Sequence, residues 1–176
     1  MFIDILKKYK PFHYALDIGT GSGCIAITLA IENIAESIDA IDKSSGALEV
    51  ADYNVNQYNA KNIQLINQDF LIEPPDHCYD LIVCNPPYIS TDQIINLDKE
   101  VLHEPICSLT DYGDGLAFYK KIINNIDVLI SNSGIILLEI GDESQISYIV
   151  NELNTINIPY KIYKDLQGKN RIIEIK

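Results

Sequence analysis

Three things are scarce in this 176-residue chain: paired cysteines, long apolar runs and positive charge. None of the four cysteines forms a C-x-x-C pair and the three histidines are scattered, so the spacing typical of metal sites is absent. No apolar run reaches the roughly 18 residues of a membrane helix. The N-terminal stretch lacks the order of a signal peptide, because its apolar residues precede the lysines. We therefore expect a cytoplasmic protein without a metal site.

The charge balance is strongly acidic. Thirteen Lys and Arg residues face 25 Asp and Glu residues, which gives a net charge of −12. A surface of that sign repels phosphate backbones, so direct nucleic-acid binding is disfavoured and a protein partner with a basic patch is favoured. One modest basic cluster, more typical of a solvated face, lies near the C-terminus at Lys161, Lys164, Lys169 and Arg171.

Segments typical of strands and helices alternate along most of the chain. Runs rich in Ile, Leu and Val predict strands at 14–18, 38–41, 63–66, 79–84, 135–140, 160–164 and 171–175. Apolar spacing and capping residues predict helices at 1–13, 24–31, 44–58, 116–130 and 144–153. This order predicts an α/β, Rossmann-like fold with a seven-stranded, mostly parallel sheet, an antiparallel C-terminal strand and helices on both faces. The remaining segment, 89–115, is too long for an idle connection and is expected to shape a site.

A glycine-rich loop joins the first predicted strand to the helix after it. In Asp17-Ile18-Gly19-Thr20-Gly21-Ser22-Gly23, glycine recurs at every second position, which permits a tight turn and a ligand close to the backbone. The spacing differs from the G-x-G-x-x-G of dinucleotide folds, and the lysine of a phosphate-binding loop is absent. The loop therefore need not hold a pyrophosphate.

Acidic residues close the next two predicted strands. Asp42 can accept hydrogen bonds from ribose hydroxyls, whereas Asp69 can accept from an adenine amino group and Phe70 can cover the ring. Ligands bind at the carboxyl ends of strands in open parallel sheets. Together the three segments resemble the class I methyltransferases, which implies S-adenosylmethionine as cofactor and S-adenosylhomocysteine (SAH) as product.

The most specific motif, Asn85-Pro86-Pro87-Tyr88, closes the fourth predicted strand. Two successive prolines fix φ and remove two donors, while their carbonyls stay free to accept. The Asn85 side-chain oxygen and the Pro86 carbonyl match the two N–H bonds of a planar –NH2 group, and Tyr88 can lie flat against that group. Alignment of the nitrogen with an activated methyl group can supply much of the barrier. The motif thus predicts methylation of an amide or amino nitrogen.

The segment after this motif points to one kind of nitrogen. The motif itself occurs in enzymes acting on adenine, on cytosine and on the glutamine side-chain amide. The segment resembles that of the HemK-type protein-glutamine methyltransferases, which modify the glutamine of the Gly-Gly-Gln loop in peptide-chain release factors. The likeness is carried by Glu104-Pro105, Gly113-Asp114-Gly115-Leu116 and Tyr119, with 15–26, 137–141 and 164–171 matching the same family.

The strand ends and the resemblance together give the candidate site. The cofactor-binding candidates are Asp17, Gly19, Thr20, Gly21, Ser22, Gly23, Asp42, Asp69, Phe70 and Asn85. The candidates for gripping the substrate amide are Asn85, Pro86, Pro87 and Tyr88. The implied partner is a peptide-chain release factor, methylated on the side-chain nitrogen of glutamine.

The beginning of the chain departs from the family pattern. Family members usually carry a small helical domain that helps to dock the release factor, and an Arg-Pro-Glu-Thr-Glu-type segment ahead of the glycine loop. Here residues 1–13 are expected to form a short helix and 14–176 the catalytic domain, so these residues do not supply the docking domain of the family pattern. Two alternatives stay open: an adenine or cytosine amino methyltransferase acting on nucleic acid, and a truncated module that binds the cofactor without activity.

Overall fold

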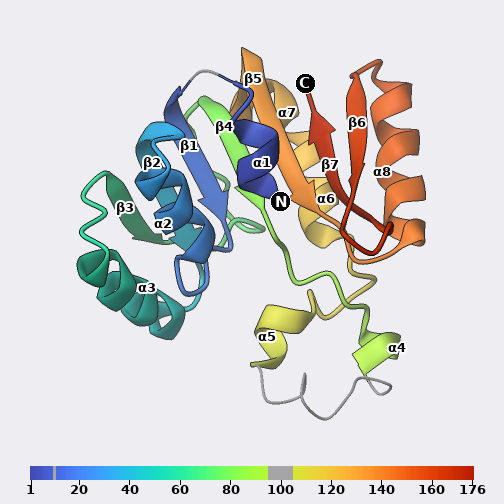
Figure 1. Ribbon diagram of the computed structural model, residues 1–176. Coiled ribbons are helices and arrows are strands. Elements are labelled where there is room, and N and C mark those ends of the chain that lie inside the picture. Colours follow the sequence, from blue (N-terminus) through green and yellow to red (C-terminus); the bar gives the residue numbers. More distant parts are fainter. Residues whose placement is uncertain (10, 95–104) are drawn as a thin grey trace.

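The computed structural model describes residues 1–9, 11–94 and 105–176, and within them seven strands form one sheet (Figure 1). The strands are β1 (Phe12–Ile18), β2 (Ala35–Asp42), β3 (Ile63–Asn67), β4 (Tyr79–Cys84), β5 (Ile130–Glu139), β6 (Tyr160–Lys164) and β7 (Asn170–Ile175). Their order is β3-β2-β1-β4-β5-β7-β6. The first five run parallel, and β7 is antiparallel to both β5 and β6. The predicted Rossmann-like sheet with its antiparallel C-terminal strand is confirmed.

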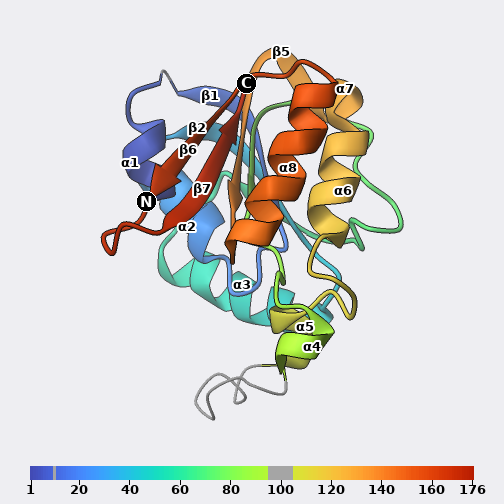
Figure 2. The ribbon, with the colours of Figure 1, turned by 90° about the vertical axis from the view of Figure 1, so that its right-hand side faces the viewer.

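Helices cover both faces of the sheet, as Figure 2 shows from the side. One face carries α1 (Phe2–Leu6), α2 (Cys24–Ile31) and α3 (Ser45–Gln57), and the other carries α6 (Ala117–Asn124), α7 (Ile126–Leu129) and α8 (Glu143–Thr155). Successive strand side chains point to opposite faces, so Ala15 lies in the core under α2 and Leu16 in the core under α6 and α8. Two apolar layers therefore fix the sheet from both sides.

The prediction of one continuous helix over 116–130 was wrong. Its helical part is broken at Asn125 into α6 and α7, and β5 begins at Ile130, not at residue 135. Residues 130–133 are partly or fully exposed, so they lack the apolar signal by which a buried strand is predicted. The early part of β5 is tied down by a polar contact, because the Ser131 hydroxyl donates to Asp80 at 3.1 Å.

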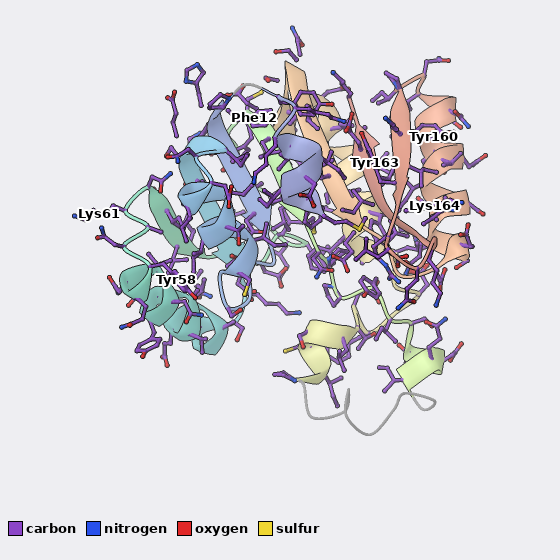
Figure 3. The ribbon with its side chains drawn as sticks, in the orientation of Figure 1. Phe12, Tyr58, Lys61, Tyr160, Tyr163 and Lys164 are labelled. Carbon is purple, nitrogen blue, oxygen red and sulfur yellow. The ribbon has the colours of Figure 1, made fainter. Side chains whose placement is uncertain are left out.

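The N-terminal helix is also shorter than expected. It ends at Leu6, and β1 begins at Phe12, paired with Ala35 of β2. The turn after α1 is held by side chains, since the Tyr9 hydroxyl donates to Glu174 of β7 at 2.8 Å. Tyr163 of β6, labelled in Figure 3, donates to the same carboxylate at 2.8 Å. The segment before β1 is thus attached to β7, which is separated from β1 by β4 and β5 in the strand order.

Between β4 and α6 the described chain forms two single helical turns. These are α4 (Thr91–Ile94) and α5 (Ile106–Leu109), and Figure 1 places both beyond one edge of the sheet. Glu104, one of the residues that carry the family resemblance, lies outside the described residues. No helix among the described residues is long and apolar enough to cross a membrane.

Candidate active site

Five strand ends meet at one edge of the sheet. Because β1 to β5 are parallel, their carboxyl ends lie together, and the glycine loop, Asp42, Asp69 and Asn85 each follow or close one of them. This edge faces α4 and α5 in Figure 1. The fold therefore brings the predicted motifs into one region, as expected for open parallel sheets.

The three glycines of the loop have different tasks. Gly19, Gly21 and Gly23 all have positive φ, at 69°, 57° and 82°. A Cβ at Gly19 or Gly21 would meet nothing within 4 Å, so the backbone there borders open space. A Cβ at Gly23 would lie 3.2 Å from Ile27 and 3.4 Å from Ala51. Gly19 and Gly21 can therefore admit a ligand, whereas Gly23 lets α2 pack on α3.

Asp17 organises this loop from inside the core. Its Oδ2 accepts from the Thr20 hydroxyl at 2.7 Å and from the Ala26 amide at 3.1 Å. Its Oδ1 is buried without a hydrogen-bond partner among the described residues. Burial raises the pKa of Asp17 to about 6, although these hydrogen bonds oppose the rise. The Thr20 side chain is turned inward, while Ser22 is exposed at the loop tip.

The two predicted strand-end carboxylates keep unused acceptor capacity. Asp42 Oδ2 accepts from the Gly21 amide and Oδ1 from the Ser44 amide, both at 2.9 Å. A carboxylate oxygen can accept two hydrogen bonds, so each keeps one site for a ligand hydroxyl. Asp69 Oδ1 accepts from the Leu71 amide at 3.0 Å. Asp42 thus joins the glycine loop to the end of β2.

A pocket lies between these segments. Gly19, Asp42, Asp69, Phe70 and Pro87 all line it, so it joins the glycine loop to the Asn-Pro-Pro-Tyr motif. Phe70 is only 3% exposed. The ring of Phe70 therefore forms part of the pocket wall and is packed mostly into the core.

The Asn-Pro-Pro-Tyr motif leaves β4 with its first acceptors free. Asn85 is exposed, and its side chain makes no hydrogen bond within the described residues. Pro86 is buried, and Tyr88 is half-buried and forms a bridge with Thr110. The Ile89 amide donates to the Leu109 carbonyl at 2.8 Å. The chain after the motif is therefore paired with the start of the 110–117 loop.

Asp111 shapes the loop that includes the Gly-Asp-Gly-Leu sequence. Its Oδ1 accepts from the amides of Gly113 at 2.8 Å and Gly115 at 3.0 Å, and its Oδ2 from that of Ala117 at 2.9 Å. Tyr119 is fully buried and donates to the Glu139 carbonyl at 2.7 Å. The Gly-Asp-Gly-Leu sequence is thus held in a loop folded around Asp111, and Tyr119 is fixed in the core beneath it.

Several residues at the site were missed in the sequence, and Phe118, Cys107 and Gln145 are the most informative of them. Phe118 and Cys107 line the pocket, and the Phe118 ring stacks on Phe70 with centroids 6.2 Å apart. No local signal marks them, because their approach depends on the fold. Gln145 donates to the Tyr88 carbonyl at 2.7 Å. Its pattern was visible as a capping box, Asp142-x-x-Gln145, at the start of α8.

Known proteins resemble this chain over most of its length. A release factor glutamine methyltransferase of Bacillus subtilis is 38% identical over 182 residues, which cover 96% of this chain and 62% of that protein. A ribosomal protein uL3 glutamine methyltransferase of Neisseria gonorrhoeae is 44% identical over 130 residues, 73% of this chain and 43% of that protein. This chain thus spans less than two thirds of both relatives.

A solved structure and a family match agree with the fold. A Streptococcus mutans protein in complex with SAH superposes with a TM-score of 0.64 at 18% identity, covering 98% of this chain and 93% of that one. The methyltransferase small domain family matches residues 1–129. With the Rossmann-like sheet and the motifs at its edge, these matches confirm the predicted resemblance to the HemK-type enzymes, and the chain belongs to the methyltransferase small domain family.

Proposed function

We propose that this methyltransferase transfers a methyl group from S-adenosylmethionine to the side-chain amide nitrogen of glutamine in the Gly-Gly-Gln loop of a peptide-chain release factor. One observation carries the proposal: the exposed side chain of Asn85, which makes no hydrogen bond to residues 1–9, 11–94 or 105–176, follows β4 at the same sheet edge as the open backbone of Gly19 and Gly21. The glutamine methyltransferases among the relatives support the choice of nitrogen.

The residues at the ends of β1 to β3 fit the proposed cofactor. S-adenosylmethionine supplies an electrophilic methyl group on a sulfonium. Asp42 would accept from the ribose hydroxyls with the lone pairs that Gly21 and Ser44 leave unused. Asp69 would accept from the adenine amino group in the pocket that it lines. The buried Asp17 Oδ1, which has no hydrogen-bond partner in the part of the chain that the structure describes, is an acceptor for which a bound donor would relieve the cost of burial.

The residues after β4 would hold the substrate amide. The Asn85 side-chain oxygen and the Pro86 carbonyl would accept the two N–H bonds of the glutamine amide, with the Tyr88 ring against its plane. Held so, the nitrogen lone pair is aimed at the methyl group. The C–N bond would form as the S–C bond breaks, with S-adenosylhomocysteine as the leaving group that keeps the bonding electron pair, and the nitrogen would then release a proton to water. Alignment and fixed acceptors provide the catalysis, so no strong general base is required.

A second protein substrate has specific support. The relative from Neisseria gonorrhoeae acts by name on ribosomal protein uL3, and its matched region is more similar to this chain than that of the release-factor enzyme. The reaction on the amide would be the same, and only the surface that presents the glutamine would differ. A ribosomal protein of the uL3 type is therefore the second candidate.

The test is a transfer assay with methyl-labelled S-adenosylmethionine. The chain is mixed with a purified release factor, with its Gly-Gly-Gln→Gly-Gly-Ala variant, with a uL3-type ribosomal protein, or with adenine- and cytosine-containing nucleic acid. Label on the wild-type release factor alone supports the proposal. Label on uL3 alone assigns the second candidate. Label on nucleic acid alone, or bound cofactor without any transfer, overturns it.

A further inference from the structure

Gln145, the third residue of α8, is buried at 3% exposure and uses both ends of its side chain. Its Oε1 accepts from the amides of Gly141 at 2.8 Å and Asp142 at 3.3 Å. Its Nε2 donates to the carbonyls of Tyr88 at 2.7 Å and Gly115 at 3.4 Å. One amide therefore joins three segments that are distant in the sequence.

Capping of α8 explains only half of these bonds. In a capping box the third helical residue accepts a hydrogen bond from the N-cap amide, a task that Glu performs as well as Gln. The Nε2 donor is not needed for that. Since both of its partners are carbonyls outside α8, an amide in place of a carboxylate is required by the loop after β4, not by the helix.

Two glycines next to Tyr88 also restrict its position. A Cβ at Gly141 would lie 2.5 Å from Tyr88 Cδ2, so the ring packs directly on that glycine. A Cβ at Gly115 would lie 2.2 Å from the Tyr88 carbonyl oxygen. The two glycines leave just the space that Tyr88 fills, and Gln145 fixes its carbonyl between them.

We propose that Gln145 is a positioning residue for methyl transfer, which acts by holding the Tyr88 peptide and with it the acceptors at Asn85 and Pro86. The proposal rests on the proposed function, because it assigns that motif to the substrate amide. Gln145 itself touches neither substrate nor cofactor. Misplacement of reacting groups by about 1 Å can lower a rate by about 10²-fold, so a loosened Tyr88 has a large expected effect.

The decisive variant is Gln145→Glu. It has nearly the same shape and keeps the acceptor for Gly141 and Asp142, but at high pH it sets a carboxylate oxygen against two carbonyls. We expect kcat at pH 8 to fall by about 10- to 100-fold, with the cofactor Kd changed less than about twofold. Burial raises the pKa of such a carboxyl, and its protonated form donates again. The ratio of variant to wild-type kcat should therefore rise as the pH falls.

Asp142→Ala is the matched control. Asp142 Oδ1 accepts from the amides of Ser144 at 2.8 Å and Gln145 at 3.2 Å, and its Oδ2 accepts from Gln93 of α4 at 3.4 Å. Its loss weakens the start of α8 and removes this one long contact with α4, but it leaves both Nε2 bonds to Tyr88 and Gly115 in place. We expect a lower Tm and a nearly unchanged kcat. The positioning role is refuted if Gln145→Glu leaves kcat unchanged. It is also refuted if Asp142→Ala, at an equal loss in Tm, lowers kcat as much as Gln145→Glu does.

A second readout is independent of the substrate. The Ile89 amide, next to Tyr88, donates to Leu109, and its hydrogen exchange reports on the loop directly. We expect faster exchange at Ile89 in Gln145→Glu but not in Asp142→Ala, with the Gly21 amide as internal reference. Unchanged exchange at Ile89 would overturn the positioning role even in an active enzyme. Failure to methylate any glutamine, with Ile89 affected as expected, would overturn the proposed function alone.

Discussion

At the ends of β1, β2 and β3, the polar side chains of the site are held mostly by close neighbours in the chain. Asp17 bonds to Thr20 and Ala26, Asp42 to Ser44 and Asp69 to Leu71, and a longer-range bond joins Asp42 to Gly21. After β4 the opposite holds. Tyr88 is held by Gln145, 57 positions away, and by the 110–115 loop. The two halves of the site, here the cofactor half and the substrate half, thus differ in the range of their contacts.

The two halves also differ in how much of the fold must be formed before each is correctly shaped. A hydrogen bond within a loop forms whenever that loop forms, so the cofactor half depends on little of the fold beyond β1 to β3, where the bond from Gly21 to Asp42 joins the loop after β1 to the end of β2. The substrate half is correct only when β4, the 110–117 loop and the start of α8 are docked together. Substitutions in each region can test this separation, because each shows whether a change in one half stays there.

Asn85→Ala should have the largest effect. It removes a side-chain acceptor proposed to hold the substrate amide, and loss of one such preorganised group typically costs about 10²- to 10³-fold in kcat. Asn85 is exposed and makes no hydrogen bond to the described residues, so the fold should not suffer. Transfer assays would measure kcat, and calorimetric titration with the cofactor would measure its Kd. A cofactor Kd raised as much as kcat is lowered would show that Asn85 serves mainly the cofactor half.

The cofactor half is also the part that the sequence predicts well. The glycine loop, Asp42 and Asp69 were expected from short motifs at strand ends, because the contacts that shape them span few residues. Two details escaped. Thr20 turns inward to Asp17, and Phe70 is a buried wall. Both depend on which face of a loop is packed, which residue type alone does not specify.

The substrate half was predictable only as a motif. The chemistry of Asn85-Pro86-Pro87-Tyr88 made the motif recognisable in the sequence. Gln145, which bonds to Tyr88, and Phe118, which lines the pocket, come close to the motif only through tertiary packing. The polar start of β5 was missed for a related reason, since Ser131 is held by Asp80 of the neighbouring strand β4. Predictions from the local sequence fail where contacts with residues distant in the sequence determine the structure.

Asp17→Asn should change how stability depends on pH. Burial raises the pKa of Asp17 from 3.8 to about 6, so the folded protein holds this proton more tightly than the unfolded chain does. Its contribution is therefore fully present below pH 3.8 and is lost as the pH rises through about 6, a change of about 3 kcal/mol. The variant lacks this loss. Urea unfolding at pH 4 and pH 7 should give a free-energy difference, variant minus wild type, that increases with pH; a constant difference would contradict the assignment.

Paired glycine variants address the two halves separately. Gly21→Ala has space for its Cβ but forces alanine to a φ of 57°, which costs about 1 to 2 kcal/mol. It should raise the cofactor Kd about tenfold. Gly141→Ala instead pushes the Tyr88 ring, with a Cβ 2.5 Å from Cδ2, and should lower kcat about tenfold without changing the cofactor Kd. Equal effects of both variants on both constants would mean that the two halves respond as one unit.

Tyr79→Phe should have the smallest effect and should spare both halves. The Tyr79 and Tyr14 hydroxyls both donate to Oδ2 of the buried Asp39, at 2.9 and 2.7 Å, far from the strand ends that form the site. Loss of one of these bonds leaves the other in place, so the free energy of unfolding should fall by about 1 kcal/mol in a urea titration. Unchanged kcat and cofactor Kd would then show that the site depends on contacts at its own edge of the sheet. A kcat reduced beyond the twofold range would mean that strain in the core reaches the Tyr88 loop, and the substrate half would have to be extended inward through β4.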